Sequence, residues 1–391
     1  MPATRCRREQ RKTGFTSCGI SWTSSGDDDG LDAAPRDRES MDGSIERVRT
    51  VLRGEIPDHP PLYELFRNDA VINHFTGDTL TVENGPELVY RAYEPAVDAT
   101  RPSVRPPGRE ETVRLPDGRE QRHFRWTIWT ENHTYASAAE YGAQKRRLLD
   151  TFDPAWSPQR QTSMAQTLAG HRSARDRLGE VFFFPGGPSP GLMGIIGEVG
   201  LEAFSYYLSD LPGLVGELLE MNTLNALAWI EHLPDDHGIE AVFCGDDIAF
   251  KTGPLLSPSW FDTHYMPRLA RICQAYHRQG IRVLFHSDGN LLPILDGLVA
   301  AGIDGLNPLE VLAGMDPAVV HRRYPHLFLA GGIDVSQLLP YGSPGQVREV
   351  VRRAVDACQG RLMVGSSTEL NDEVPLANYL SLREAVLEEV A

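Results

Sequence analysis

The sequence predicts an α/β protein built as a single (β/α)8 barrel of the TIM type, with a β-hairpin excursion and a disordered N-terminal leader. Three observations favour this fold. Short apolar runs alternate with helical patterns through the C-terminal half, and a polar cluster follows each run. The length of 391 residues is one that such a barrel often occupies as a single unit.

Residues 1–40 are polar, contain Ser, Gly and Asp clusters such as the one at 24–30, and show no sustained periodicity. Segments of this composition bury too little apolar surface to fold on their own. We therefore expect 1–40 to be a disordered leader and 41–391 to form the barrel domain.

The first elements after the leader are indicated by caps and apolar spacing. Ser44–Gly54 is expected to be a helix, with its first residue as the N-cap and a glycine after its last turn. Leu62–Phe66 is expected to be the first barrel strand and carries Glu64. Leu88–Val97 is expected to be helical, and one further strand must follow it at a place that the pattern does not reveal.

Residues 110–135 interrupt the alternation. Thr112–Leu115 and Glu120–Trp129 are β-prone runs, and the Pro-Asp-Gly between them has the composition of a turn. Because a hairpin is out of place in an alternating chain, we interpret 110–135 as an excursion that covers one end of the core and could act as a lid.

The alternation becomes regular in the second half of the chain. The expected strands are Val181–Phe184, Ala241–Cys244, Arg282–Phe285, Ile303–Leu306, Leu327–Ala330 and Arg361–Val364. The expected helices are Leu201–Leu208, Leu211–His232, Ser259–Gln279, Leu291–Ala301, Asp316–Tyr324, Pro344–Cys358 and Leu376–Val390. Strands separated by helices in this way pair in parallel, so their carboxyl ends meet at one end of the barrel.

Polar side chains follow the expected strands at that end. They are Asp246, Asp247, His286, Asp288, Asn307, Glu310, Asp334, Ser367 and Glu369. Carboxylates gathered this closely repel one another and raise their own pKa values unless a proton, a cation or a metal lies between them. This charge balance is the physical case for a functional site.

His286 and Asp288 are the central candidates. They end the run Arg282–Asn290, in which an apolar strand stops abruptly at a histidine, a carboxylate and a flexible glycine. Two such side chains at a strand end can reach one metal, proton or substrate group. The structural alternative is that each residue only caps a neighbouring element, and this alternative suits Asp247 and Asp334 as N-caps.

Charge and cysteine usage limit the partners and the compartment. The net charge of -16 argues against nucleic acid and against an anionic membrane surface, because both require a basic footprint. Five scattered cysteines without a C-x-x-C pair predict a reducing, cytoplasmic environment. No apolar run approaches the ~20 residues needed to span a bilayer. We expect a small-molecule substrate, and the sequence gives no indication of the oligomeric state.

Several motifs together resemble the uroporphyrinogen decarboxylase superfamily. They are Gly245-Asp246-Asp247, Thr252–Pro258, His286–Asn290, Ala301–Asp304, Gly314-Met315-Asp316, Gly331–Asp334 and Val374–Asn378. The resemblance begins near Met41, is strongest from Val242 onward, and is poor in the hairpin region. It implies a (β/α)8 barrel.

The resemblance implies one of two activities. The first is decarboxylation of the acetate side chains of uroporphyrinogen, without metal or cofactor. The second is methyl transfer among corrinoid proteins and thiols or other acceptors, with a zinc held by a His-x-Cys pair and a distal cysteine.

This sequence departs from both patterns. Authentic decarboxylases carry an arginine-rich segment near the N-terminus and an F-S-D-I segment, and Pro61–Asn68 has no equivalent arginine pair. His286 matches the methyltransferase histidine, but Asp288 stands in place of the first cysteine, and Ser366–Thr368 in place of the distal one. His286 and Asp288, with Glu369 or Asp247, would make a harder N/O site for zinc or another divalent ion.

Three hypotheses follow. The first is a methyltransferase-like enzyme that moves a methyl group between a corrinoid protein or small donor and a small acceptor, with Asp246 or Asp247 orienting the substrate. The second is a lyase that decarboxylates a porphyrinogen or small carboxylate without cofactor, with Asp246, His286 or Asp288 as proton donor. The third is a non-catalytic barrel that binds a ligand or tetrapyrrole. The expected substrate-binding residues are Glu64, Asn307, Glu310, Asp334 and Ser367.

Overall fold

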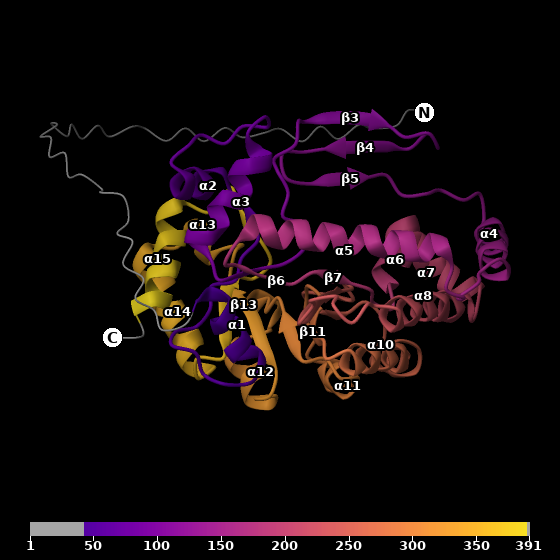
Figure 1. Ribbon diagram of the computed structural model, residues 1–391. Helices are drawn as coiled ribbons and strands as arrows, with labels where there is room; N and C mark the ends of the chain where they lie inside the picture. Colours follow the sequence, from indigo (N-terminus) through magenta and orange to yellow (C-terminus); the bar gives the residue numbers. More distant parts are fainter. Residues whose placement is uncertain (1–42, 389–391) are drawn as a thin grey trace, which may run out of the picture. The chain divides into compact units, whose positions relative to one another are not determined.

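Parallel strands form the centre of the protein, and helices pack against them (Figure 1). The computed structural model describes residues 43–388, so the predicted leader 1–40 lies outside the described residues. Six strands pair side by side in parallel, in the order β14-β13-β12-β11-β8-β7. Their bounds are β7 Gly186–Gly187, β8 Ala241–Gly245, β11 Arg282–His286, β12 Gly305–Asn307, β13 Phe328–Ile333 and β14 Leu362–Ser366.

Further pairings join the two edges of this sheet. β2 (Ala99–Thr100) pairs in parallel with β6 (Phe182–Phe183), which is followed directly by β7. Tyr63 donates its N–H to the Val364 carbonyl of β14 at 2.8 Å, and Glu64 donates its N–H to the first carbonyl of β2 at 3.1 Å. Hydrogen-bonded neighbours therefore follow one another around the core. The predicted parallel α/β fold of the TIM-barrel type is confirmed.

The strand that the apolar pattern does not reveal is β2. It has only two residues, and Asp98 and Arg101 flank it, so no apolar run marks its place. β1 (Phe66–Arg67) continues the first strand region and pairs in parallel with β15 (Leu370–Asn371) near the carboxyl end of the barrel. The small antiparallel pair β9 (Ala249–Phe250) and β10 (Gly253–Pro254) follows β8.

The helices agree with the predicted alternation and extend it. Their bounds are α1 Ser44–Leu52, α2 Asp69–Thr76, α3 Gly85–Ala96, α4 Ala138–Asp150, α5 Pro158–Leu178, α6 Leu192–Val199, α7 Leu201–Asp210, α8 Leu214–Glu231, α9 Pro258–Trp260, α10 Met266–Arg278, α11 Leu295–Ala300, α12 Pro317–Arg323, α13 Leu338–Tyr341, α14 Pro344–Ala357 and α15 Leu376–Glu388. The predicted helix Ser259–Gln279 is interrupted by a π-helical turn, Phe261–Tyr265. The N-cap of α1 is Gly43, and the prediction of Ser44 at this position is wrong by one residue.

Helix α1 closes the amino-terminal end of the barrel. Its Val48 and Val51 are buried and pack in one cluster with interior side chains such as Phe184 and Leu284. Its Arg49 pairs with Glu240, the residue before β8, which fixes α1 at the start of the strands. The carboxyl ends of the strands therefore remain the open end, where ligands of parallel barrels bind.

A buried ion pair ties α1 to the first strands. Arg47 is 2% exposed, and its guanidinium contacts Asp98 at 2.7 Å and Asp58 at 2.6 Å. The second oxygen of Asp98 accepts the N–H of Leu62 at 2.8 Å. Asp98 is thus bonded to α1 and to the first strand at once, directly beside β2.

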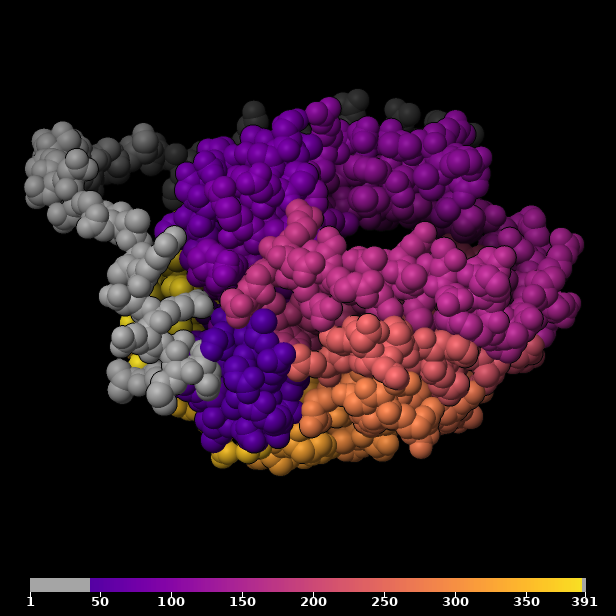
Figure 2. Space-filling model, in the orientation of Figure 1, coloured from indigo at the N-terminus to yellow at the C-terminus, as the bar shows by residue number. Residues whose placement is uncertain are grey.

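The predicted hairpin is present and has a third strand. β3 (Glu111–Arg114), β4 (Glu120–His123) and β5 (Ile128–Thr130) form an antiparallel sheet that Figure 1 draws apart from the parallel strands. The space-filling view shows the surface of this segment along one edge of the described residues (Figure 2). Asp69 and Asp372, which follow β1 and β15, hold the end of this sheet through Arg125 at 2.6 Å and the Trp126 indole at 3.0 Å. These contacts tie the hairpin to the carboxyl end of the barrel.

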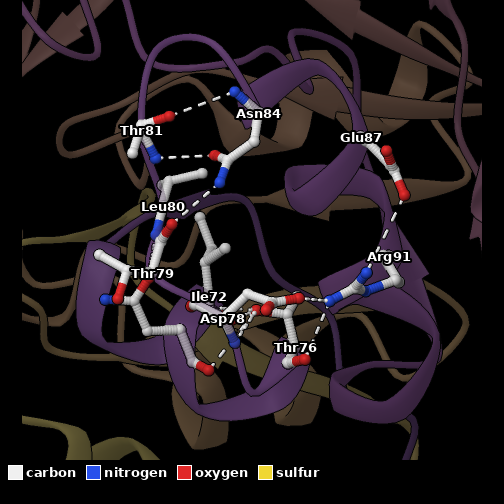
Figure 3. A network of polar contacts seen from close by, with 10 residues as sticks. Ile72, Thr76, Asp78, Thr79, Leu80, Thr81, Asn84, Glu87 and Arg91 are labelled. Atoms are coloured by element: carbon white, nitrogen blue, oxygen red, sulfur yellow. Dashed lines mark hydrogen bonds and ion pairs between the residues drawn. The ribbon is translucent and has the colours of Figure 1, made fainter.

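The connection between α2 and α3 is held by polar contacts near the surface (Figure 3). Asn84 accepts the N–H of Thr81 at 2.7 Å and donates to the Thr79 carbonyl at 2.9 Å. Arg91 contacts the Asp78 carboxylate and donates to the Thr76 carbonyl at 2.9 Å. No helix among residues 43–388 is long and apolar enough to cross a bilayer.

We predict that Asp98→Ala destabilises the protein by about 3 kcal/mol or more, because it leaves the Arg47 guanidinium buried with one carboxylate fewer. The matched control is Asp78→Ala, whose ion pair with Arg91 is exposed, and we expect it to cost less than about 1 kcal/mol. Urea unfolding of both variants measures the difference. Equal losses of stability would contradict the structural role of Asp98.

Candidate functional site

The ends of β8 and β11 bring three of the predicted site residues together. β8 and β11 pair in parallel with Gly245 opposite His286, so the residues that follow both strands leave the barrel at the same end. One ligand atom from each of Asp247, His286 and Asp288 lies within 4.8 Å of the others. Nε2 of His286 is 3.5 Å from a carboxylate oxygen of Asp247, and the N–H of Asp288 donates to the same oxygen at 3.0 Å. We call these three residues the acidic cluster.

The orientation of the His286 ring is fixed by Asn307. The Asn307 amide nitrogen donates to the Ala330 carbonyl at 3.1 Å, so its oxygen faces Nδ1 of His286, at 2.8 Å. Nδ1 must then carry the proton, and Nε2 of the neutral ring is an acceptor directed at the acidic cluster. Burial, together with the charge of Arg101, lowers the pKa of His286 to about 4. The ring is therefore neutral at pH 7, as metal binding requires.

Asp288 brings a carboxyl oxygen with no hydrogen-bond partner in the described part of the chain. Its Oδ1 is buried and unpaired. Burial, together with the charges of Asp247 and Glu310, raises the pKa of Asp288 to about 7. A buried polar atom without a partner is costly, so this position favours a ligand, a cation or a proton.

The donor set of the acidic cluster is one imidazole nitrogen and two carboxylates. This set suits zinc or another divalent ion with a preference for N and O ligands. Glu369, which the sequence predicts as a metal ligand, lies outside the acidic cluster and pairs with Arg67 at 3.7 Å, and its role as a ligand remains a prediction. The sequence names Glu369 or Asp247 as the residue that joins His286 and Asp288, and of these two Asp247 lies in the cluster.

Asp246 has a structural position. Its carboxylate is 1% exposed and accepts the N–H groups at 191–193, between 2.6 and 3.0 Å, and the Tyr265 hydroxyl at 2.9 Å. It therefore caps the N-terminus of α6. These contacts occupy both oxygens of the Asp246 carboxylate within the fold. The catalytic role predicted for Asp246 remains a prediction.

Asn307 and Glu310 support the acidic cluster from β12 and the loop after it. Glu310 accepts the N–H of Gly289 at 2.8 Å and thereby holds the loop that carries Asp288. Gly289 has a φ of 90° and lies against the backbone of Ala249, so a side chain at this position has no room. Both predicted substrate-binding residues thus lie next to the cluster, and Asn307 contacts it directly.

A comparison with known protein families decides the relationship. The family model described as uroporphyrinogen decarboxylase (URO-D) matches residues 158–388, which is more than half of the 391 residues. The chain belongs to the URO-D family. No match was found among curated proteins.

Solved structures with a similar fold include a methyltransferase from Methanosarcina mazei. It is 18% identical to this URO-D chain with a TM-score of 0.62, and the alignment covers 89% of this chain and 99% of that chain. A putative vitamin-B12-independent methionine synthase from Listeria monocytogenes is 14% identical, covers 56% of this chain and 67% of its own, and has a TM-score of 0.34. The first likeness shows a shared fold, and the second is too weak to carry an argument.

Two other predicted substrate-binding residues of this URO-D chain bond to the loops. Asp334 accepts the N–H groups of Gln337 and Leu338 at 2.7 and 2.8 Å, at the start of α13, although the N-cap residue of this helix is Gln337. Ser367 accepts the N–H of Val335 at 3.2 Å and is 3% exposed. Neither residue contacts the acidic cluster, and their polar groups are used in holding the loop after β13.

Arg101 is a residue of the site that the sequence analysis misses. Its guanidinium carbon is 5.3 Å from the centre of the Phe243 ring, and that ring is 4.7 Å from the His286 ring. The Arg101 guanidinium also donates to the Thr368 carbonyl at 2.9 Å. The positively charged Arg101 and the candidate ligand His286 therefore contact the same aromatic ring. No sequence signal marks it, because β2 is too short to show as a strand.

Glu64 lies on the first strand and is buried against the end of β14. Its two oxygens accept the N–H and the hydroxyl of Ser366, both at 2.8 Å, and the N–H of Leu65 at 2.9 Å. Burial nevertheless raises the pKa of Glu64 to about 7, against an ordinary value of 4.5. The predicted substrate contact of Glu64 remains a prediction, and its burial has a consequence for stability.

We predict that the free energy of unfolding of the native protein falls, relative to Glu64→Gln, as pH rises from about 5 to about 7. The folded state keeps the Glu64 proton in this window while the unfolded chain loses it, so rising pH favours the unfolded state. The difference between the two proteins should change by up to about 1 kcal/mol per pH unit. Urea unfolding at several pH values measures it, and parallel pH profiles would contradict the raised pKa.

Proposed function

We propose that the protein is a methyltransferase-like enzyme that moves a methyl group between a corrinoid protein or small donor and a small acceptor. The observation that carries the proposal is the acceptor nitrogen of His286, held beside two carboxylates by the Asn307 contact at 2.8 Å. This arrangement resembles the metal-binding half of the methyltransferase pattern, with carboxylates in place of thiolates. The shared fold of the Methanosarcina mazei methyltransferase supports the same reading.

The residues of the acidic cluster fit a divalent ion. His286 would supply Nε2, Asp288 would supply its unpaired Oδ1, and Asp247 would supply its half-exposed carboxylate. A divalent ion bound there would lower the pKa of a bound acceptor, so that the acceptor is a nucleophile at neutral pH. Two carboxylates compensate the charge of such an ion, and the ion in turn removes the repulsion between them.

The surrounding residues fix the geometry of the cluster. Asn307 keeps the proton of His286 on Nδ1, and Glu310 holds Gly289 and thus the loop of Asp288. Asp246 fixes the start of α6 beside the same strand ends. Groups held in this way bind an acceptor without large rearrangement, which is what orientation of a methyl transfer requires.

We predict that His286→Ala and Asp247→Asn lose bound zinc, with dissociation constants at least about tenfold higher than that of the native protein. The measurement is elemental analysis after dialysis, followed by calorimetric titration with zinc. The matched control is His277→Ala, because His277 lies on α10 at the surface and pairs with Asp304 far from the acidic cluster. Native protein that binds no divalent ion would contradict the proposal.

We predict that Asn307→Ala weakens zinc binding by about 10- to 100-fold, although Asn307 is not one of the proposed zinc ligands. Without the amide oxygen the imidazole proton is free to move to Nε2, and the ring loses its fixed orientation. Calorimetric titration of folded variant measures the change, with circular dichroism as a check on the fold. Zinc affinity equal to that of the native protein would show that the contact with Nδ1 has no such role.

A second candidate function is favoured by the unpaired oxygen of Asp288. In a lyase of this family a carboxylate substrate would lose carbon dioxide, and protonated Asp288 would donate its proton to the carbon left behind. This reaction needs no metal. Decarboxylation that persists in protein freed of divalent ions would favour the lyase over the methyltransferase.

A further inference from the structure

Three arginines gather beside the acidic cluster. Arg67 lies on β1, and Arg101 and Arg105 lie on the loop that follows β2. Arg67 is 2% exposed and donates to the Ser103 carbonyl of this loop at 2.7 Å. Arg67 and Arg105 also share Trp126, since Arg67 lies 5.9 Å from its ring and Arg105 donates to its carbonyl at 2.5 Å. We call Arg67, Arg101 and Arg105 the arginine cluster.

The arginine cluster has hydrogen-bonding capacity to spare. Within residues 43–388, the hydrogen bonds of the arginine cluster go to backbone carbonyls. Nε of each of its three side chains is buried without a hydrogen-bond partner among these residues. A guanidinium has five N–H donors in a planar fork, and this fork matches a carboxylate or phosphate. Buried donors of this kind are normally satisfied by a partner or a ligand.

The charge of the arginine cluster is also poorly compensated. Within residues 43–388, Glu369 is the carboxylate that forms an ion pair with it, at 3.7 Å from Nε of Arg67. Burial lowers the pKa of Arg67, and the neighbouring charges of Arg105 and Arg101 lower it further. Three cations with one carboxylate require an additional anion for the same reason that gathered carboxylates require a cation.

The position of the cluster relates this anion to the candidate site. The Phe243 ring lies 5.3 Å from the guanidinium carbon of Arg101 and 4.7 Å from the His286 ring. Arg67 pairs with Glu369, whose charge in turn affects Asp288. A small molecule held by the arginines would therefore extend toward the acidic cluster across the carboxyl end of the barrel.

We propose that the arginine cluster binds an oxyanion of the substrate, a carboxylate, sulfonate or phosphate, while the opposite end of the substrate reaches the acidic cluster. The identification of the ligand as the substrate rests on the proposed function. The binding of the anion itself depends only on Arg67, Arg101 and Arg105. Planar guanidinium forks favour such oxyanions over single-atom anions.

The test is calorimetric titration of the full-length protein at neutral pH with two probes, acetate and inorganic phosphate. We expect saturable binding of one probe with a dissociation constant on the order of 1 mM, as small anions in a built site give. The preferred probe tells whether the oxyanion is planar or tetrahedral. Arg101→Gln and Arg105→Gln should each weaken binding at least tenfold.

The matched control is Arg109→Gln. Arg109 belongs to the same segment, but its side chain is 73% exposed and pairs with Glu83. It should leave probe binding unchanged. No saturable binding of either probe, or unchanged affinity in Arg101→Gln and Arg105→Gln variants that remain folded by circular dichroism, would overturn the inference.

The same samples separate this inference from the proposed function. Zinc content and zinc affinity should be unchanged in the Arg105→Gln variant, and probe binding should persist in His286→Ala. If the native protein binds a probe but binds no divalent ion, the anion site is supported and the methyltransferase proposal is contradicted. Zinc binding in a protein that binds neither probe would support the metal site and overturn the anion site.

Discussion

The parallel pairing of β8 with β11 is the interaction on which the candidate site depends. It sets Gly245 opposite His286, so that the chain leaves both strands at the same level. Asp247 and Asp288 then meet, and the N–H of one donates to the carboxylate of the other at 3.0 Å. Because side chains alternate between the two faces of a strand, a shift of one residue would turn His286 out of the barrel and separate the cluster.

Opposite charges lie close together at this end of the barrel without neutralising each other. The Phe243 ring contacts both Arg101 and His286, and no ion pair among the described residues joins the arginine cluster to the acidic cluster. Direct pairing of the arginine cluster with the acidic cluster would satisfy both and leave no charge for a ligand. The separation leaves unpaired donors on one side and an unpaired carboxyl oxygen, that of Asp288, on the other. Such sites bind polar molecules with two different ends, because each end meets groups already oriented and desolvated.

The part of the site that the sequence predicts is the part encoded by strand ends. His286 and Asp288 follow a clear apolar run, and the rule that parallel strands end together brings them to one place. Asp246 follows an equally clear run, but its partners at 191–193 are more than fifty positions away, so no local pattern shows that it is a cap. Arg101 follows a strand of two residues that has no periodicity to detect.

The alternation of side chains on β8 also explains why carboxylates, and no thiolate, line the site. Cys244 faces outward, where its sulfur lies 3.5 Å from the Pro188 carbonyl, and burial raises its pKa well above the usual value. Gly245 takes the inward position, where an added Cβ would lie 3.1 Å from the Phe243 ring and 3.9 Å from the His286 ring. A thiolate cannot enter from β8 without displacing one of these rings. The preference of the site for a cation is therefore set by the carboxylates of the loops, which favour harder ions than a cysteine site does.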